Sequence, residues 1–500
     1  MSQLKKGAIL SYVSILLTNV IGLVLTPFII RSLGDSEYGL YTLIGAIVGY
    51  ISVMDLGLNN TIVRYVSKYR AENNSLKEYN FLGTVLLIYF VISLIVALVG
   101  FLLYYNLESF FGLSLTLIEM EKAKIMFLIL IFNLAISLPG GSFTAIANAY
   151  EHFVFPRSLN IIKYIVRSVL VYVILTYGAE SVGLVVLDTI VNIIVIVISF
   201  WYVKVRLKTK FMFSGVETSL MKQIFSYSLW IFLFALIAQF QWKGGQIIIG
   251  MKMSTSDVAI YAVGIMLGTY YGAFSGAIGG VFLPKATKMV VNKSSEDDLT
   301  KMFSRISRFS LMSLMIIFIG FFFIGKEFLL LWVGETYLLA WHVALVVMVA
   351  YTVPLIQTFA NSLLEAKGLF KVKALVYLSC LTLGSLLAYI LIDYFGVIAV
   401  IYCICAGWIV GQIIMNVYFH RVLKLNIIYF FKENTKGFLL TFILTSGIGV
   451  FLNNYAADSW SELSLKAMTL VGAYIVIIYF LGINKEEKKT INALFLKLKK

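Results

Sequence analysis

Polar side chains recur on one side of an otherwise apolar stretch between residues 225 and 249. They are spaced at i, i+3, i+4 and i+7, which places them on one face of an α-helix: Gln239, Trp242, Lys243 and Gln246. A lysine and two amides on such a face can bind an anion and hydroxyl groups, and an indole can contact the face of a sugar ring. We interpret these four residues as candidate substrate-binding residues for a phosphate-bearing, hydroxyl-rich ligand.

A second set of polar residues lies in and beside the stretch from 38 to 63, where Asp55 and Asn59 share a helical face. Arg64 follows them and Arg31 ends the preceding apolar stretch. An ionisable residue at the centre of a membrane-spanning helix costs about 2.5–3.5 kcal/mol, so it normally faces protein or water. We therefore add these four residues to the candidate substrate-binding set.

Each candidate has a structural alternative. Lys243 can extend its ammonium group to the outer membrane surface, and Asp55 and Arg64 can pair with neighbouring residues. Asp188, in a later apolar stretch, is expected to be a structural partner, with ion coupling as the alternative. No catalytic residue is expected.

The elements that position these residues must be membrane-spanning helices. Of the 500 residues, 60% are hydrophobic and only 13% are charged, which is about half the usual charged fraction. Apolar residues run in blocks of about 20, the length that crosses a bilayer. The three cysteines lie inside such blocks, so we expect no disulfide framework, no metal site and no cofactor. The net charge of +15 is read as a topology signal and not as a sign of nucleic-acid binding.

Hydropathy predicts an all-α polytopic membrane protein with about fourteen transmembrane helices. The predicted spans are roughly 8–30, 38–63, 81–104, 125–147, 164–177, 182–203, 225–249, 258–283, 310–331, 341–364, 374–392, 396–419, 437–454 and 465–482. Most of the 40 Lys and Arg residues fall in alternate connections and adjoining helix ends, for example Arg157 and Lys163 before the fifth span and Arg167 in its first turn. By the positive-inside rule both termini face the cytoplasm.

The domain organisation is predicted as two six-helix lobes around a central cavity, followed by two C-terminal helices. The N-lobe covers 1–205, a cytoplasmic linker 206–224 and the C-lobe 225–422. Residues 423–500 hold the last two spans and a basic cytoplasmic tail. A collinear internal repeat supports two parallel lobes, because Ser36 and Tyr41 match Ser256 and Tyr261 at an offset of 220.

The chain resembles a known family in its first 70 residues most strongly. The segment Thr26-Pro27-Phe28-Ile29-Ile30-Arg31-Ser32-Leu33-Gly34 runs into Glu37-Tyr38-Gly39-Leu40-Tyr41 and then Asp55-Leu56-Gly57-Leu58. With these motifs and fourteen predicted spans, the chain is similar to the polysaccharide (O-antigen, capsule or teichuronic acid) flippases. These belong to the multidrug/oligosaccharidyl-lipid/polysaccharide exporter superfamily. For Leu33, Gly34, Tyr38 and Gly39, which match a family motif, we expect a role in a helix turn and not in ligand contact.

The resemblance implies a flippase that moves undecaprenyl-diphosphate-linked oligosaccharide from the inner to the outer leaflet of the bacterial cytoplasmic membrane by alternating access. Its partners would be this glycan, membrane lipids and a coupled proton or sodium ion, with no nucleic acid, and the protein would be a monomer. The alternative is a proton- or sodium-coupled drug or metabolite exporter of the same superfamily. A third interpretation, a glycosyltransferase that uses lipid-phosphate sugars, comes from the paired acids of Asp35-Ser36-Glu37. The same acidic position recurs as Asp257 in the repeat, which favours a capping role at a helix start. We therefore expect no enzyme.

Overall fold

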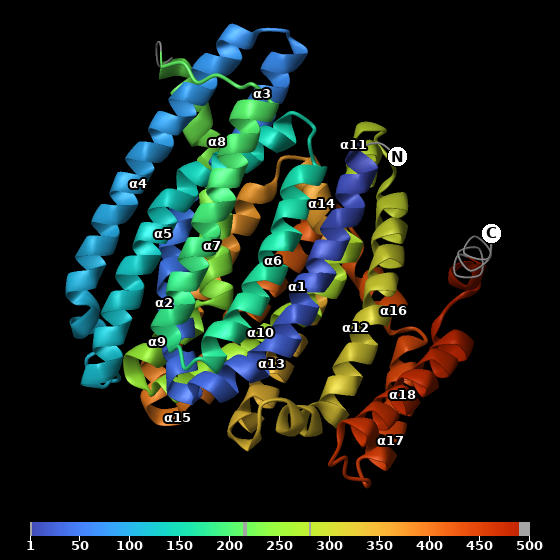
Figure 1. Cartoon of the computed structure of the whole chain (residues 1–500). Coiled ribbons are helices and arrows are strands. Elements are labelled where there is room, and N and C mark those ends of the chain that lie inside the picture. The colour runs from blue at the N-terminus through green and yellow to red at the C-terminus, as the bar shows by residue number, and fades with distance from the viewer. Residues whose placement is uncertain (1–2, 214–217, 280–281, 490–500) are drawn as a thin grey trace. The chain divides into compact units, whose positions relative to one another are not determined.

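The computed structural model describes residues 3–213, 218–279 and 282–489. Within these ranges every regular element is a helix (Figure 1). Eleven helices are long and apolar enough to cross a membrane. Large apolar side chains are exposed along them, for example Leu94 at 57% and Leu386 at 56%, as lipid-facing residues should be. The predicted fold class, an all-α protein with many membrane spans, is confirmed.

Contacts between residues divide the chain into two units. Unit 1 comprises Met1–Ala259 and Tyr389–Val400, and unit 2 comprises Ile260–Ala388 and Ile401–Lys500. The predicted lobe boundaries stay a prediction. The helices of unit 1 are α1 (Gln3–Leu33), α2 (Asp35–Ser52), η1 (Val53–Asp55), α3 (Leu58–Ala71), α4 (Ser75–Phe111), α5 (Leu117–Ala149), α6 (Val154–Thr176), α7 (Ser181–Trp201), η2 (Tyr202–Arg206), α8 (Thr218–Trp242), α9 (Gly244–Lys252) and the first turn of α10 (Thr255–Gly279).

Helix α5 is the centre of unit 1. It packs against α4 on one side and α7 on the other, and it also contacts α2 and α3 (Figure 1). A capping box begins α5, because the Thr116 hydroxyl accepts from the Glu119 backbone while the Glu119 carboxylate accepts from the Thr116 backbone. Helix α6 lies against α1 and α7, and these contacts place the polar faces of α5, α6 and α7 together.

The second predicted span, 38–63, is broken in the structure. α2 ends at Ser52, a single 3-10 turn follows, and α3 begins at Leu58. Leu56 and Gly57 both adopt left-handed backbone angles, with φ of 53° and 66°. A Cβ atom at position 57 would lie 2.4 Å from Cγ2 of Ile231, so this site in the break accommodates only glycine.

The seventh predicted span, 225–249, is also broken. α8 ends at Trp242 and α9 begins at Gly244, with Lys243 between them at φ −122°. Two consecutive glycines, Gly244 and Gly245, follow the break, and glycine pairs are a common cause of kinks in helices. The four polar residues are therefore divided between α8, which holds Gln239 and Trp242, and α9, which holds Gln246, with Lys243 between them. Their shared face stays a prediction.

Unit 2 is built around a long helix, α12. Its helices are the rest of α10, α11 (Leu283–Val291), α12 (Glu296–Trp332), η3 (Glu335–Tyr337), α13 (Leu338–Ile356), α14 (Thr358–Ala366), most of α15 (Phe370–Arg421), α16 (Ile427–Thr435), α17 (Phe438–Leu452), α18 (Trp460–Ile477) and η4 (Ile478–Gly482). α15 contains two predicted spans, because Gly396 at φ 60° and ψ −147° interrupts it.

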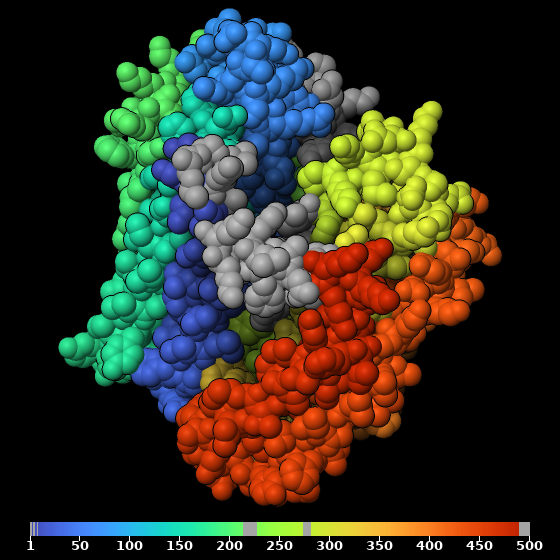
Figure 2. Space-filling view, turned by 90° about the vertical axis from the view of Figure 1, so that its right-hand side faces the viewer, coloured from blue at the N-terminus to red at the C-terminus, as the bar shows by residue number. Residues whose placement is uncertain are grey.

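The last two long helices, α17 and α18, pack against α12 and against each other. An apolar core joins them, and it includes Ile319 of α12, Phe438 of α17 and Leu470 of α18. Lys466 of α18 donates to both carboxylate oxygens of Glu327, at 2.6 and 2.8 Å. Figure 2 shows one end of this unit, where the yellow surface of α11 and the first turns of α12 adjoins the red surface of α18 and the segment after it.

Candidate functional site

Unit 1 contains a polar cavity of about 330 Å³ among α5, α6 and α7. Its walls combine small, amide and cationic residues: Ser137, Gly140, Gly141, Thr144, Pro156, Arg157, Leu159, Asn160, Lys163, Asn192, Val195, Ile196 and Ser199. All three helices are membrane-span candidates. A polar cavity among membrane-spanning helices is typical of a substrate or ion pathway.

Helix α6 supplies the cations of this cavity. Arg157, Asn160, Lys163 and Arg167 lie on one side of the helix, because their spacing of three and four residues follows the helical period. The half-buried Lys163 donates to Oδ1 of Asn192 at 3.2 Å, and Asn160 donates to the hydroxyl of Ser14 at 3.3 Å. Neither Lys163 nor Arg157 forms an ion pair in the described part of the chain, so both charges are available to an anion.

A network of amides and hydroxyls forms the wall opposite Lys163. Asn192 of α7 donates to Oδ1 of Asn133 at 2.7 Å and to the hydroxyl of Ser137 at 2.6 Å. Ser137 in turn donates to the backbone carbonyl of Asn133. Because the Asn192 amide group uses its hydrogens within the protein, its oxygen is fixed toward Lys163. The network therefore orients the ammonium group of Lys163 before any ligand binds.

The fourth polar residue of this α6 face, Arg167, is neutralised. Its guanidinium forms an ion pair with Asp188 of α7, with an Nη2 to Oδ2 distance of 2.9 Å. Tyr41 of α2 donates to the same carboxylate at 3.0 Å. Both charged side chains are about one quarter exposed or less. Asp188 thus ties α2, α6 and α7 together, as a structural partner is expected to do.

The structure brings two predicted site residues together. The Tyr89 hydroxyl of α4 lies 3.2 Å from Oδ1 of Asp55 and 3.2 Å from Oδ1 of Asn59. Tyr89 is fully buried and both partners are half-buried. Asp55 thus has a neighbouring partner in Tyr89, and Arg64 has one in the ring of Tyr65, as the structural alternative expected.

The remaining predicted residues are dispersed. Arg31 is exposed at the end of α1, and Arg64 is exposed on α3 with its guanidinium 5.9 Å from the centre of the Tyr65 ring. Lys243, between α8 and α9, and Gln239 and Trp242, near the end of α8, are half-buried, and Gln246 is 2% exposed with its amide oxygen unpaired. None of these residues lines the polar cavity of unit 1.

Comparison with known protein families identifies the family of this chain. The model of a family described as polysaccharide biosynthesis protein matches residues 4–290. The chain belongs to the polysaccharide biosynthesis protein family. A curated protein of Shigella flexneri, named as an O-antigen transporter, is 23% identical over 385 residues, which cover 74% of this chain and 87% of that protein.

The fold of this family member is shared with solved membrane transporters. The lipid II flippase MurJ in an inward closed conformation has a TM-score of 0.69 at 16% identity, covering 94% of this chain and 98% of that one. The MATE multidrug transporter DinF-BH has a TM-score of 0.62 at 14% identity, covering 84% and 95%. At these identities the likeness establishes the fold.

The family match contains the whole polar cavity, because its lining residues run from 137 to 199. Its cationic residues were missed as site residues by sequence reasoning, which began the fifth span at 164 whereas α6 begins at Val154. Hydropathy moves a boundary away from charged residues, and so Lys163 was assigned to the connection. The signal that could have identified the site is the spacing of Arg157, Asn160, Lys163 and Arg167.

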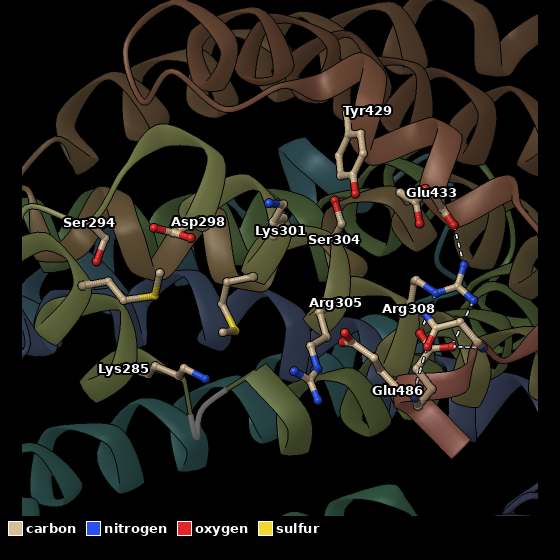
Figure 3. A pocket seen from close by; sticks show the side chains of 14 residues that line it. Lys285, Ser294, Asp298, Lys301, Ser304, Arg305, Arg308, Tyr429, Glu433 and Glu486 are labelled. Carbon is tan, nitrogen blue, oxygen red and sulfur yellow. Dashed lines mark hydrogen bonds and ion pairs between the residues drawn. The ribbon is translucent and has the colours of Figure 1, made fainter. Parts of the chain in front are cut away.

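A second cavity of about 650 Å³ lies in unit 2, mostly beyond the family match. Figure 3 shows Arg308 at one end of it, near Glu433 and Glu486. Arg308 donates to the backbone carbonyl of Glu433 and to the carboxylate of Glu487. The cavity's other labelled cations are Lys285, Lys301 and Arg305, and its acids include Asp298 and Glu486. The wall of this cavity thus carries charges of both signs.

The guanidinium of Arg308 makes contacts with four residues of the protein. It pairs with Glu487 at 2.6 Å and donates to the backbone carbonyls of Gly482, at 2.8 Å, and Lys436, at 3.1 Å. Its side chain is 5% exposed and that of Glu487 is 1% exposed. We interpret Arg308 as a structural residue that fastens the segments after α16 and α18 to α12, and the polar cavity of unit 1 remains the better candidate for ligand binding.

Proposed function

We propose that this family member is a flippase that carries undecaprenyl-diphosphate-linked oligosaccharide from the inner to the outer leaflet of the bacterial cytoplasmic membrane. The observation that supports this most directly is the polar cavity, where Lys163 and Arg157 face amide and hydroxyl groups among membrane-spanning helices. The names of the relatives, an O-antigen transporter and a lipid II flippase, point to the same class of cargo.

The chemistry of the cavity fits the head group of such a cargo. A diphosphate is an anion with several acceptor oxygens, and charge-assisted hydrogen bonds from lysine and arginine are stronger than neutral ones. The nearby amides, such as Asn160, can exchange hydrogen bonds with sugar hydroxyls. At about 330 Å³ the cavity is near the lower end of ligand pockets, roughly 300–1,000 Å³. It therefore suits the diphosphate end of the cargo, not the whole oligosaccharide.

The membrane potential can drive this movement. With both termini in the cytoplasm, an anion that leaves a negative interior gains about 2.3 kcal/mol per charge for each 100 mV. A diphosphate carries more than one charge, so the gain is multiplied. A cationic cavity contributes by lowering the cost of placing the anion between helices, where the dielectric constant is low.

The second candidate function is a drug or metabolite exporter of the same superfamily, and the similarity to DinF-BH favours it. Deleting the gene separates the two. A flippase deletion should leave lipid-linked oligosaccharide intermediates accumulated on the cytoplasmic side. An exporter deletion should instead increase drug sensitivity with no such accumulation.

The cavity itself is tested by Lys163→Gln, which removes the charge and keeps a polar side chain. Losing one charge-assisted hydrogen bond, about 1.5–3 kcal/mol, should weaken cargo binding by roughly 10- to 150-fold. Delivery of glycan to the outer face should fall accordingly at equal protein level. Lys77→Gln is the matched control, because Lys77 is an exposed lysine at the start of α4. Equal delivery by the two variants would remove Lys163 from the binding site.

A further inference from the structure

The charged cavity of unit 2 is lined by four basic and four acidic side chains. At about 650 Å³ it falls within the range of ligand pockets, roughly 300–1,000 Å³. The charged lining residues are Lys285, Lys301, Arg305, Arg308, Asp298, Glu433, Glu486 and Glu487. Because their formal charges cancel, the lining favours neither an anion alone nor a cation alone. It favours a ligand that carries one charge of each sign.

The two signs come from different elements of the fold. Lys285 belongs to α11, and Lys301 and Arg305 belong to α12. Glu433 belongs to α16, and Glu486 follows η4 (Figure 3). A ligand held between these elements therefore meets cations on α11 and α12 and carboxylates on α16 and the chain after η4.

Several lining groups can form a contact with a ligand. The Lys285 side chain is exposed and that of Glu433 is half-buried, and neither charge has an ion pair within the described residues. Ser304 is 4% exposed, yet its hydroxyl has no hydrogen-bond partner in that part of the chain. A buried polar group without a partner is costly. A cation and a hydroxyl can donate to a phosphate, and a carboxylate can accept from an ammonium group.

An apolar groove of about 370 Å³ begins where the charged cavity ends. Leu311 and Phe318 of α12 line it, and so do Phe438 and Phe442 of α17. The Arg308 guanidinium, which lines the cavity, lies 4.5 Å from the centre of the Phe438 ring. Both helices belong to membrane-span candidates. A ligand that fills the cavity and the groove is therefore charged at one end and apolar at the other, as a phospholipid is.

The position of the cavity along the spans agrees with a lipid head group. Its α12 residues belong to the first half of that helix, before the apolar groove residues. Helix α16 exposes Ile428 at 81% and Phe431 at 38% beside the charged Lys432, which is typical of a helix at the membrane surface. The positive-inside rule predicts that this end of unit 2 faces the inner leaflet.

We propose that the charged cavity and the apolar groove together bind a zwitterionic phospholipid of the inner leaflet, one whose head group carries a phosphate and a primary ammonium. Lys285 and the Ser304 hydroxyl donate to the phosphate, and the Glu433 carboxylate accepts from the ammonium. One acyl chain lies in the groove between α12 and α17. The bound lipid thereby links α11, α12 and α16, and it uses none of the residues that line the polar cavity of unit 1.

Other phosphate-bearing ligands match the lining less well. A prenyl diphosphate or an anionic phospholipid has no positive group, so it leaves the carboxylates of Glu433 and Glu486 without a partner. A choline head group has a positive charge but no N–H group to donate to them. The expected order of binding is therefore phosphatidylethanolamine first, with phosphatidylglycerol and phosphatidylcholine weaker.

Native mass spectrometry of the delipidated full-length protein in detergent measures this order. The probes are the dioleoyl forms of the three lipids. Phosphatidylethanolamine should bind roughly two- to fivefold more tightly than the other two, the size of one partly exposed ion pair. Soluble glycerophosphoethanolamine, which has the head group and no acyl chains, should not displace it. If the soluble head group binds equally well, the groove has no part and the lipid assignment is wrong.

Charge variants test the cavity. Glu433→Lys should reverse the preference, so that phosphatidylglycerol binds more tightly than phosphatidylethanolamine. Lys285→Gln should weaken the binding of both lipids by roughly two- to fivefold. Lys288→Gln, on an exposed lysine of the same helix, and Glu335→Lys, on an exposed acid, are the matched controls, because neither residue lines the cavity. Both controls should keep the wild-type order.

A bulky substitution tests the groove. Val353→Trp fills it and should reduce the retention of all three lipids, because Val353 lines the groove. Val410→Trp is the control, since Val410 is 50% exposed and does not line the groove. Size-exclusion profiles identify any variant that fails to fold, and the comparison of lipids on wild-type protein needs no variant.

The inference is overturned by equal retention of the three lipids on wild-type protein, or by an unchanged order in Glu433→Lys. It is also wrong if farnesyl diphosphate displaces bound phosphatidylethanolamine, because the cavity would then belong to a prenyl-diphosphate cargo. No step of the experiment uses transport. A failed flippase assay therefore leaves this result intact, and the absence of a bound lipid leaves the proposed flippase function intact.

Discussion

Replacing Arg308 by alanine should destabilise unit 2 and release the segment after Gly482. The guanidinium makes an ion pair with Glu487 and donates to the backbone carbonyls of Glu433, Lys436 and Gly482. Both charged side chains are almost fully buried. Alanine would leave the Glu487 carboxylate inside the protein without its cation, and three carbonyls would lose a donor.

The size of the effect follows from this burial. Removing one partner of a buried ion pair costs about 3–5 kcal/mol, most of it from the stranded charge. The lost carbonyl contacts are part of the same site and do not add in full. Replacing both residues, as in Arg308→Met with Glu487→Met, removes the stranded charge and should recover most of the loss. Lys301→Ala on the same helix is the control, because Lys301 pairs with Asp297 at an exposed position, and its midpoint should not change.

The assay is denaturation of the purified protein in detergent, followed by helicity, together with limited trypsin digestion. Arg308→Ala should lower the denaturation midpoint and make Lys485 and Lys488 available to trypsin, because the segment after Gly482 loses its anchor. The double Met variant should be close to wild type in both measurements. If Arg308→Ala behaves like Lys301→Ala, or if the double variant is worse than either single one, burial of the pair is not what holds this segment.

Three further predictions concern the helix contacts. Asp188→Asn should destabilise unit 1 by about 1–3 kcal/mol, less than a fully buried pair because Arg167 keeps some solvent contact, and a lowered melting temperature checks this. Gly57→Ala should destabilise by more than about 1 kcal/mol, since the new Cβ meets Ile231 at a left-handed position, and Ile231→Ala should partly rescue its melting temperature. Gly384→Leu should prevent the two halves of α15 from packing, because a Cβ there lies 2.7 Å from the Cys403 carbonyl oxygen, and the yield of monodisperse protein should fall.

The sequence predicted the membrane helices well because each depends on a long apolar run, which is a local property. Even the division of α15 at Gly396 was predicted, since its boundary falls between 392 and 396. The breaks at Leu56 and Lys243 were not predicted. They depend on packing against distant residues, as Gly57 does on Ile231, and hydropathy contains no information about such contacts.

The candidate site was predicted only in part, for the same reason. Asp55 and Asn59 were found because their spacing alone puts them on one face, and the structure connects them through Tyr89. Lys163 was missed because its cost in a membrane is offset by Asn192 on another helix. A hydropathy scale assigns the full cost to the lysine, so it excludes from a span the charged residues that tertiary contacts stabilise.

The two glycines of the family motif, Gly34 and Gly39, are each explained by the structure around them. Gly34 has φ 81° and precedes the first turn of α2, which confirms the expected turn. Gly39 has a different role, since a Cβ there would lie 1.8 Å from the carbonyl oxygen of Thr255. Only glycine lets α2 approach the start of α10 so closely. The approach brings Ser36 and its repeat counterpart Ser256 to 3.3 Å, hydroxyl to hydroxyl. The two matching turns therefore lie against each other in unit 1, because the missing side chain of Gly39 leaves room for the backbone of Thr255, and the parallel order of the repeats stays a prediction.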